Sequence, residues 1–193
     1  AAELADADAS QPLHGLPYLL KDLFDLTGVP MLAGSTFLDQ VRPLSTRDSA
    51  IAMRLRERGA SCAGKSQLVE FASGLTGENP HYGDCPHPQF PDRLSGGSSS
   101  GSAALVAAGV VPLSIGTDTG GSVRVPAAFC GLHGYRASLG RGDWRGGAHL
   151  AESFDTMGFL FRDLEDAPLF ASLLAPPPAT LTPSFTQFAV VDD

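Results

Sequence analysis

Two stretches dense in glycine and serine constrain the fold of this chain more than any other feature: "SGGSSSGSAA" (95–104) and "GTDTGGSVRVPAAFCG" (116–131). Glycines packed this closely cost conformational entropy on folding, so they are expected where the backbone takes positive φ or closely approaches a ligand. A flexible glycine-serine linker is the alternative explanation. However, both stretches adjoin the apolar segments 103–108 and 110–115, which belong in a core. They therefore predict ordered turns within a folded domain.

The composition is that of a globular protein with a sizeable core. The 193 residues are 43% hydrophobic and 18% charged, enough for one domain or at most two small ones. A formal net charge of -8 without a basic run argues against nucleic acid as a partner. The longest apolar run, 103–115, is broken by glycine and proline, so no membrane span is predicted. Three cysteines without a C-x-x-C pair suit a reducing compartment and predict a cytoplasmic protein.

The order of the expected elements predicts an α/β fold. Residues 18–20 form an apolar, β-favouring run that ends at Lys21, and the segment 48–58 is typical of a helix that ends at Gly59. A short strand (60–66), a short helix (67–74), a helix (102–109) and a buried strand (110–118) follow along the chain. Because strands alternate with helices, we predict a mixed, partly parallel sheet flanked by helices.

The segment from Gly59 to Ser66, "GASCAGKS", matches the phosphate-binding loop pattern G-x-x-x-x-G-K-[ST]. In such a loop Lys65 would reach the outer phosphates and Ser66 would ligate magnesium. The pattern requires a strand before the first glycine and a helix after it, whereas here a helix precedes it. Nucleotide binding is therefore a minor alternative, and Gly59 is better explained as a helix C-cap.

Two further patterns point to other chemistries. Gly97, Ser99 and Gly101 satisfy G-x-S-x-G, the serine turn of many hydrolases, but two prolines precede it where a central strand is required. The segment "HYGDCPHP" (81–88) holds three potential metal ligands, but zinc ordinarily takes four and no second cluster is evident. We therefore predict no metal site.

The two glycine-serine stretches lie within "SGGSSSGSAALVAAGVVPLSIGTDTGGSVRVPAAFCG" (95–131), which resembles the signature of the amidase signature family. The similarity extends to "LHGLPYLLKDLFDLTGVPMLAGS" and "GASCAGKSQLVEFA" before it and to "SFDTMGFLFRDLEDA" after it. These separated motifs occur in the family's order and cover most of residues 13–174. The resemblance implies the amidase signature fold in an incomplete form and an enzyme that hydrolyses carboxylic amides.

The resemblance also implies roles for individual residues. Ser122, in "TGGS", matches the family's nucleophile, Ser98 matches its bridging serine, and Lys21, in "LLKD", matches its base. A cis peptide bond is implied between Gly97 and Ser98. No cofactor and no metal are implied. The oxyanion hole is expected from four consecutive backbone N–H groups, those of Thr119, Gly120, Gly121 and Ser122.

The implied chemistry makes a demand on Lys21. A serine hydroxyl is a poor nucleophile unless a base accepts its proton, and a lysine can accept one only when neutral. Because the ordinary lysine pKa is about 10.4, it must be lowered by roughly 3 pH units for Lys21 to be neutral near pH 7. Burial among the apolar residues of "LPYLLKDLF" can do this. Ser98 would relay the proton from Ser122 and return it to the leaving nitrogen.

Several alternatives stay open. Ser100 replaces a glycine of the family's usual "GGSSGGS", a form associated with the allophanate hydrolase branch and with urea-derived substrates. An A-type amidotransferase subunit, which releases ammonia from glutamine and works with partner subunits, is a second possibility. Otherwise a small-molecule amide and a homodimer are expected. Outside these activities, the chain could be a truncated, non-catalytic remnant.

The expected domain organisation follows from the resemblance. Residues 1–175 are predicted to form the N-terminal half of the amidase signature core. Residues 176–193 are predicted to be a Pro-rich linker followed by the start of a further strand, "FAVVDD". Because the family's second half lines its substrate pocket, much of that pocket is not expected within this sequence.

Overall fold

The computed structural model describes residues 10–174. The strands are β1 (Pro17–Lys21), β2 (Ser61–Ser66), β3 (Leu113–Asp118), β4 (His133–Arg136) and β5 (Thr156–Phe161). The α-helices are α2 (Leu38–Val41), α3 (Ala50–Glu57), α4 (Ser100–Ala107), α5 (Arg124–Phe129) and α6 (Ala167–Ser172). Two short 3-10 helices are η1 (Glu70–Ala72) and η2 (Leu164–Asp166).

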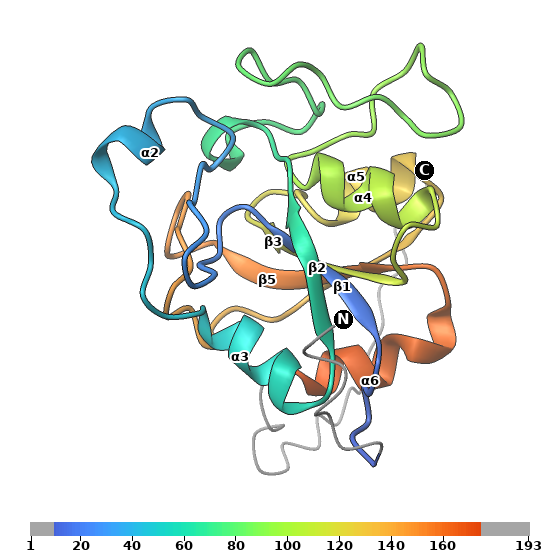
Figure 1. Cartoon of the computed structure of the whole chain (residues 1–193). Coiled ribbons are helices and arrows are strands. Elements are labelled where there is room, and N and C mark those ends of the chain that lie inside the picture. The colour runs from blue at the N-terminus through green and yellow to red at the C-terminus, as the bar shows by residue number, and fades with distance from the viewer. Residues whose placement is uncertain (1–9, 175–193) are drawn as a thin grey trace, which may run out of the picture.

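The five strands form one sheet in the order β2-β1-β3-β5-β4 (Figure 1). β1 pairs in parallel with both β2 and β3, whereas β5 pairs in antiparallel fashion with β3 and with β4. The predicted mixed, partly parallel sheet flanked by helices is therefore confirmed. The parallel part places the ends of β1, β2 and β3 at the same edge of the sheet, where the candidate site lies.

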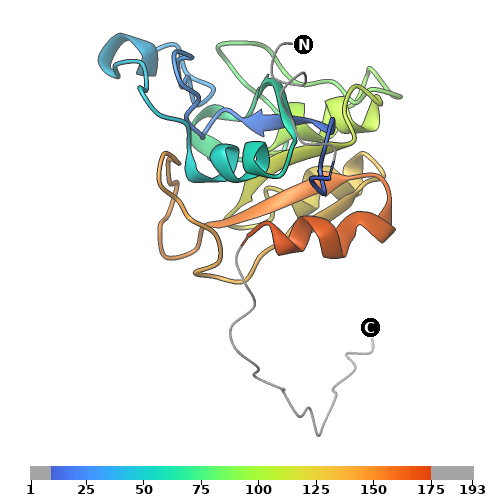
Figure 2. The ribbon, with the colours of Figure 1, turned by 60° about the horizontal axis from the view of Figure 1, so that its bottom comes forward.

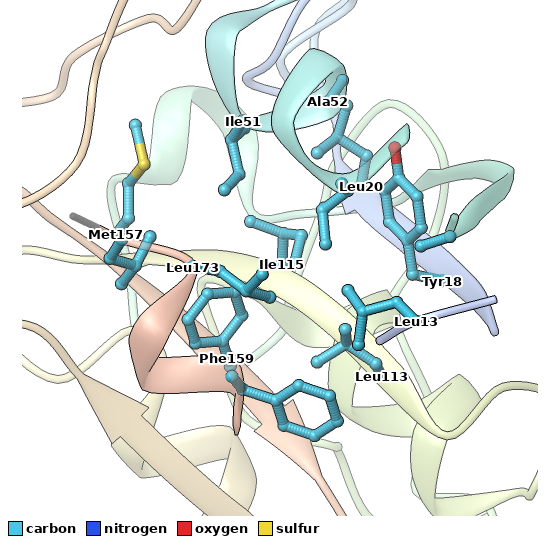
Figure 3. Close-up of a cluster of buried hydrophobic side chains, with 14 of the residues drawn as sticks. Leu13, Tyr18, Leu20, Ile51, Ala52, Leu113, Ile115, Met157, Phe159 and Leu173 are labelled. Carbon is cyan, nitrogen blue, oxygen red and sulfur yellow. The ribbon is translucent and has the colours of Figure 1, made fainter. Parts of the chain in front are cut away.

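The larger core fills the side of the sheet that α3 and α6 cover (Figures 1 and 2). Figure 3 shows how Leu20 and Ile115 from the sheet meet Ile51 from α3 and Leu173 from the end of α6. All four side chains are buried. Removing apolar side chains from water is the main favourable contribution to the free energy of folding, about 25 cal/mol per Å² of apolar surface buried.

The opposite side of the sheet is covered by α4 and α5. Val106 of α4 packs on Leu19 of β1, and Ala103 packs in a second cluster with Leu160 of β5. Side chains alternate between the two faces of a strand, so Lys21 lies on the same side as Leu19 and is directed towards α4. The alternation of β1 thus explains why the lysine meets the segment that begins α4.

The helix boundaries bear out most of the expected elements and correct one of them. α3 ends at Glu57 and Gly59 follows with φ 89°, as the C-cap interpretation requires. The helix expected over 67–74 is wrong, because only the single turn η1 forms there. The N–H of Val69 donates to Ser98 O at 3.1 Å and that of Phe71 to Ala33 O at 2.8 Å. Tertiary acceptors therefore take the donors that a helix would use.

Other predictions shift slightly or lie outside the described residues. α4 begins at Ser100, two residues before the expected start. The predicted linker and strand of 176–193 lie outside the described residues, and the core boundary at 175 stays a prediction. Across residues 10–174, no helix combines the length and the apolar character needed to cross a bilayer.

Candidate active site

Lys21 lies at the end of β1 with its side chain completely buried. Its Nζ donates to Ser98 Oγ at 2.7 Å and to Thr117 Oγ1 at 2.8 Å. Burial lowers the pKa of Lys21 to about 7, although the negative charges of Asp118 and Asp155 raise it in part. At neutral pH a large fraction of Lys21 is therefore a neutral amine, which can accept a proton from a neighbouring hydroxyl.

Ser98 lies two residues before α4, in a segment whose backbone is held on both sides. The Gly97–Ser98 peptide bond is cis, as the resemblance implied. Gly97 N–H donates to Leu75 O at 2.7 Å, and Ser98 O accepts from Val69 N–H at 3.1 Å. A side chain at Gly97 would have its Cβ 2.8 Å from Val69 Cγ2, which leaves room only for glycine. These contacts hold the Ser98 hydroxyl against Lys21.

Ser122 closes the glycine turn that connects β3 to α5, and it is buried. Its carbonyl oxygen accepts a hydrogen bond from Ser99 N–H at 3.1 Å. The turn therefore lies against the residue that follows Ser98. The structure thus joins Lys21, at the end of β1, to Ser98 in the loop before α4, and it places the backbone of Ser122 against that of Ser99.

The buried carboxylate of Asp118, at the end of β3, organises this turn. Its Oδ1 accepts from Gly121 N–H at 2.9 Å and its Oδ2 from Val123 N–H at 3.1 Å. Arg124 donates to both oxygens, at 2.9 and 3.0 Å. Burial alone would raise the pKa of Asp118, but the bonds from Arg124 and the backbone outweigh it and lower the pKa. The N–H of Gly121 is thus already bonded within the protein.

A second buried carboxylate, Asp155, holds the other end of the turn. Its Oδ1 accepts from the Thr119 hydroxyl at 2.5 Å. Its Oδ2 accepts from the backbone N–H groups of Leu150 and Ala151 at 2.8 and 3.1 Å, and His149 Nδ1 lies 3.0 Å away. One buried carboxylate thus contacts both the start of the glycine turn and the loop at residues 149–151.

The segment from Gly59 to Ser66 does not form a phosphate-binding loop, because β2 occupies most of it. Lys65 forms an ion pair with Asp22 and also donates to Pro30 O at 3.1 Å. Ser66 Oγ shares a hydrogen bond with another serine hydroxyl at 2.7 Å. Both polar side chains of the motif are engaged within the protein, as expected for a connector between the lysine and serine segments.

The remaining patterns are not assembled into sites. Ser99, the serine of G-x-S-x-G, is buried, and its hydroxyl donates to the Thr117 carbonyl at 3.4 Å. In the segment 81–88, His81 pairs with Glu70, whereas His87 bonds to a backbone carbonyl. Within residues 10–174, no group of three His, Cys, Asp or Glu side chains is arranged to hold a metal ion.

Sequence reasoning did not predict Thr117, Asp118 or Asp155 as parts of the site. The sequence does carry a signal for Thr117 and Asp118, because polar residues at the end of a buried apolar strand need hydrogen-bond partners. Both residues also directly precede the glycine turn. For Asp155, the only signal in the sequence is one acidic residue before an apolar run. Its partner Thr119 lies 36 residues earlier, so this contact depends on the tertiary fold.

The mixed sheet, with a buried lysine at the end of β1 bonded to a serine in the loop before α4, has the arrangement of an amidase-type α/β protein. A model of the Amidase family matches residues 1–184, and the chain belongs to this family. It is similar to the indoleacetamide hydrolase of Pseudomonas savastanoi, with 44% identity over 164 residues, which are 85% of this chain and 36% of that protein.

Two further similarities extend the comparison. The A-type subunit of the glutamyl-tRNA(Gln) amidotransferase of Anaeromyxobacter dehalogenans is 44% identical over 180 residues, which are 91% of this chain and 36% of that protein. Among solved structures, a variant of the Kluyveromyces lactis allophanate hydrolase matches with a TM-score of 0.82 and 35% identity, over 95% of this chain and 30% of that one. The chain spans about a third of the length of the curated relatives it matches.

Proposed function

We propose that this chain carries the catalytic residues of an amidase that hydrolyses carboxylic amides other than peptide bonds. The observation that carries the proposal is the buried contact of 2.7 Å between Lys21 Nζ and Ser98 Oγ, with the Lys21 pKa lowered to about 7. The family match and the amidases among the relatives support the same class of reaction. The scheme uses no cofactor.

In the proposed reaction, Lys21 is the base, Ser98 the proton relay and Ser122 the nucleophile. Neutral Lys21 accepts the proton of Ser98 while Ser98 accepts that of Ser122, whose Oγ attacks the amide carbonyl carbon. As the C–N bond breaks, the proton returns through Ser98 to the nitrogen, which leaves as ammonia or an amine. Water then attacks the acyl-enzyme ester, releases the carboxylic acid and restores the Ser122 hydroxyl.

The negative oxygen of the tetrahedral intermediate needs N–H donors, which we assign to the turn from Thr119 to Ser122. The N–H of Gly121 already donates to Asp118 Oδ1. The donors to the oxyanion would therefore be Thr119, Gly120 and Ser122, with Gly121 fixing the turn. Loss of one such donor typically costs about 3 kcal/mol of transition-state stabilisation.

The substrate is proposed to be a small-molecule amide, and two specific observations favour particular alternatives. Similarity to an A-type amidotransferase subunit favours glutamine as the substrate, with release of ammonia. In that case the chain would work with partner subunits and not as a homodimer. Ser100 and the similarity to an allophanate hydrolase favour a urea derivative. A cytoplasmic location also belongs to the proposal, because three cysteines without a C-x-x-C pair suit a reducing compartment.

The proposal is tested by treating the full chain with a fluorophosphonate probe and mapping the modified residue by mass spectrometry. We expect labelling at Ser122, loss of labelling in Ser122→Ala and retention in Ser100→Ala. The Ser100 variant is a matched control, because its hydroxyl is buried without a hydrogen-bond partner in the described residues. Ammonia release from indoleacetamide, allophanate and glutamine would then separate the substrate alternatives.

A folded chain that is not labelled at Ser122 would contradict the proposal and favour a non-catalytic role. Folding is checked by circular dichroism and by a cooperative thermal transition, which are independent of activity. Labelling at Ser99 instead of Ser122 would support the G-x-S-x-G alternative.

A further inference from the structure

The end of the β3–β5 ladder is extended by side chains rather than by backbone. The last backbone pair in the ladder is Asp118 with Thr156, whose Oγ1 also donates to Asp118 O at 2.9 Å. The next step in the same register is Thr119 with Asp155, which are joined through Thr119 Oγ1 at 2.5 Å. The start of the glycine turn is thus fixed to the residue that precedes β5.

Asp155 also reaches the segment that follows Lys21. Its second oxygen holds the loop at residues 149–151. That loop is paired with the chain just after β1: Ala148 N–H donates to Leu23 O, and Asp25 N–H donates to Gly146 O, both at 2.8 Å. One buried carboxylate therefore links the turn that carries Ser122 with the backbone next to Lys21.

We propose that Asp155 is a positioning residue, which aligns the turn from Thr119 to Ser122 with the Lys21–Ser98 pair through its contacts to Thr119 and to the loop at residues 149–151. This inference rests on the proposed function. Asp155 does not touch the reacting atoms in this scheme. Its two oxygens act on two different segments, so the geometry of the site depends on both sets of hydrogen bonds.

The negative charge of Asp155 gives the test of this positioning role a second readout, the pH dependence of Lys21. A negative charge stabilises the ammonium form, so Asp155 opposes the effect of burial on the Lys21 pKa, as Asp118 does. Among the described residues, Arg124 and Arg136 pair with Asp118, His149 Nδ1 lies 3.0 Å from Asp155 Oδ2, and Lys65 pairs with Asp22. Removing only the Asp155 charge should lower the Lys21 pKa.

The test uses four single variants of the full chain and one double variant. Asp155→Asn removes the charge and leaves an amide NH₂ facing backbone donors, whereas Thr119→Val removes only the hydroxyl of the contact. Thr119→Ser keeps that hydroxyl. Asp143→Asn is the matched control, because Asp143 lies in the same loop but is exposed and bonded to Arg145.

Two measurements are made on each variant: the rate of Ser122 labelling between pH 5 and 9, and hydrogen exchange of the turn 119–122. Thr119→Val should lower the plateau rate about tenfold to a hundredfold, because a small misplacement of catalytic groups can cost that much. Its pH midpoint should stay unchanged, and Thr119→Ser should recover most of the rate. Asp155→Asn should lower the plateau and also move the midpoint to lower pH.

In both disruptive variants the amides of the turn should exchange faster than in wild type and in Asp143→Asn. The double variant Thr119→Val/Asp155→Asn should have a plateau no lower than the worse single variant, because both changes break the same contact. Wild-type plateau rates and wild-type exchange in folded Thr119→Val and Asp155→Asn would overturn the inference. A wild-type chain that is not labelled contradicts the proposed function instead, and the exchange data still decide whether Asp155 positions the turn.

Discussion

The two lysines of the chain, Lys21 and Lys65, lie on the neighbouring strands β1 and β2, one residue apart in register, and their side chains have different partners. In the β1–β2 register, Leu20 pairs with Lys65 and Lys21 pairs with Ser66. Lys65 has a carboxylate partner, Asp22, and a carbonyl acceptor. Lys21 is bonded to two hydroxyls, and the nearby acids influence it only through space.

This difference shows that the degree of burial and the available partners together decide the chemistry of a lysine, because Lys21 is completely buried and Lys65 only partly. An ion pair keeps the ammonium form and gives the lysine a structural role. Hydroxyl partners do not repay the cost of burying a charge, so the neutral amine becomes accessible near pH 7. The sequence motif that marks Lys65 as a nucleotide-binding lysine is therefore a poorer guide than the environment of each side chain.

The largest expected contrast is in activity. Lys21→Met should reduce Ser122 labelling and amide hydrolysis by about 10³-fold or more, because it removes the only base in the proposed relay. Lys65→Met should change the rate per folded molecule by no more than a few fold. Steady-state rates, normalised to the folded fraction, measure both. A Lys65 variant as inactive as the Lys21 variant would break the distinction between the two lysines.

The second contrast is in stability, and here the Lys65 variant should be the more strongly affected of the two. Lys65→Met leaves the buried Asp22 without its cation and should lower the free energy of unfolding by about 3 to 5 kcal/mol. Burial raises the pKa of Asp22, so the loss should become smaller as the pH falls and Asp22 takes up a proton. Urea unfolding measures it, and the double variant Lys65→Met/Asp22→Asn should recover part of the loss. A single variant as stable as wild type would show that the ion pair contributes little.

The third prediction concerns pH. Only neutral Lys21 can accept a proton, so the labelling rate should rise about tenfold per pH unit below the Lys21 pKa of about 7 and level off above it. Lys21→Arg should be inactive at every pH, because an arginine stays protonated. Lys65→Arg keeps a cation beside Asp22 and should keep the wild-type profile. A flat wild-type profile between pH 5 and 9 would exclude Lys21 as the base.

How far the sequence predicts this site can be followed through particular residues. The resemblance and the strand pattern were enough to place Lys21 at the end of β1, and the cis bond before Ser98 was implied correctly. The expected helix over 67–74 was wrong because its N–H groups bond to distant carbonyls, which no local pattern records. The Thr119–Asp155 contact was missed for the same reason: it exists only when β3 and β5 pair.

The smallest expected effect is that of added nucleotide on thermal stability, and a lack of stabilisation would itself support the structural role of Lys65. If Gly59 to Ser66 bound Mg-ATP, a ligand concentration of 100 times Kd would stabilise the fold by about 2.7 kcal/mol, which a thermal-shift experiment resolves. We expect no saturable shift, because Lys65 is bound to Asp22 and Pro30 and the segment is a strand. A saturable stabilisation that disappears in Lys65→Ala would give Lys65 a ligand-binding role and remove the contrast with Lys21. Without such a shift, Lys65 is a structural lysine, and Lys21 is the one whose burial without an ion-pair partner makes it available for chemistry.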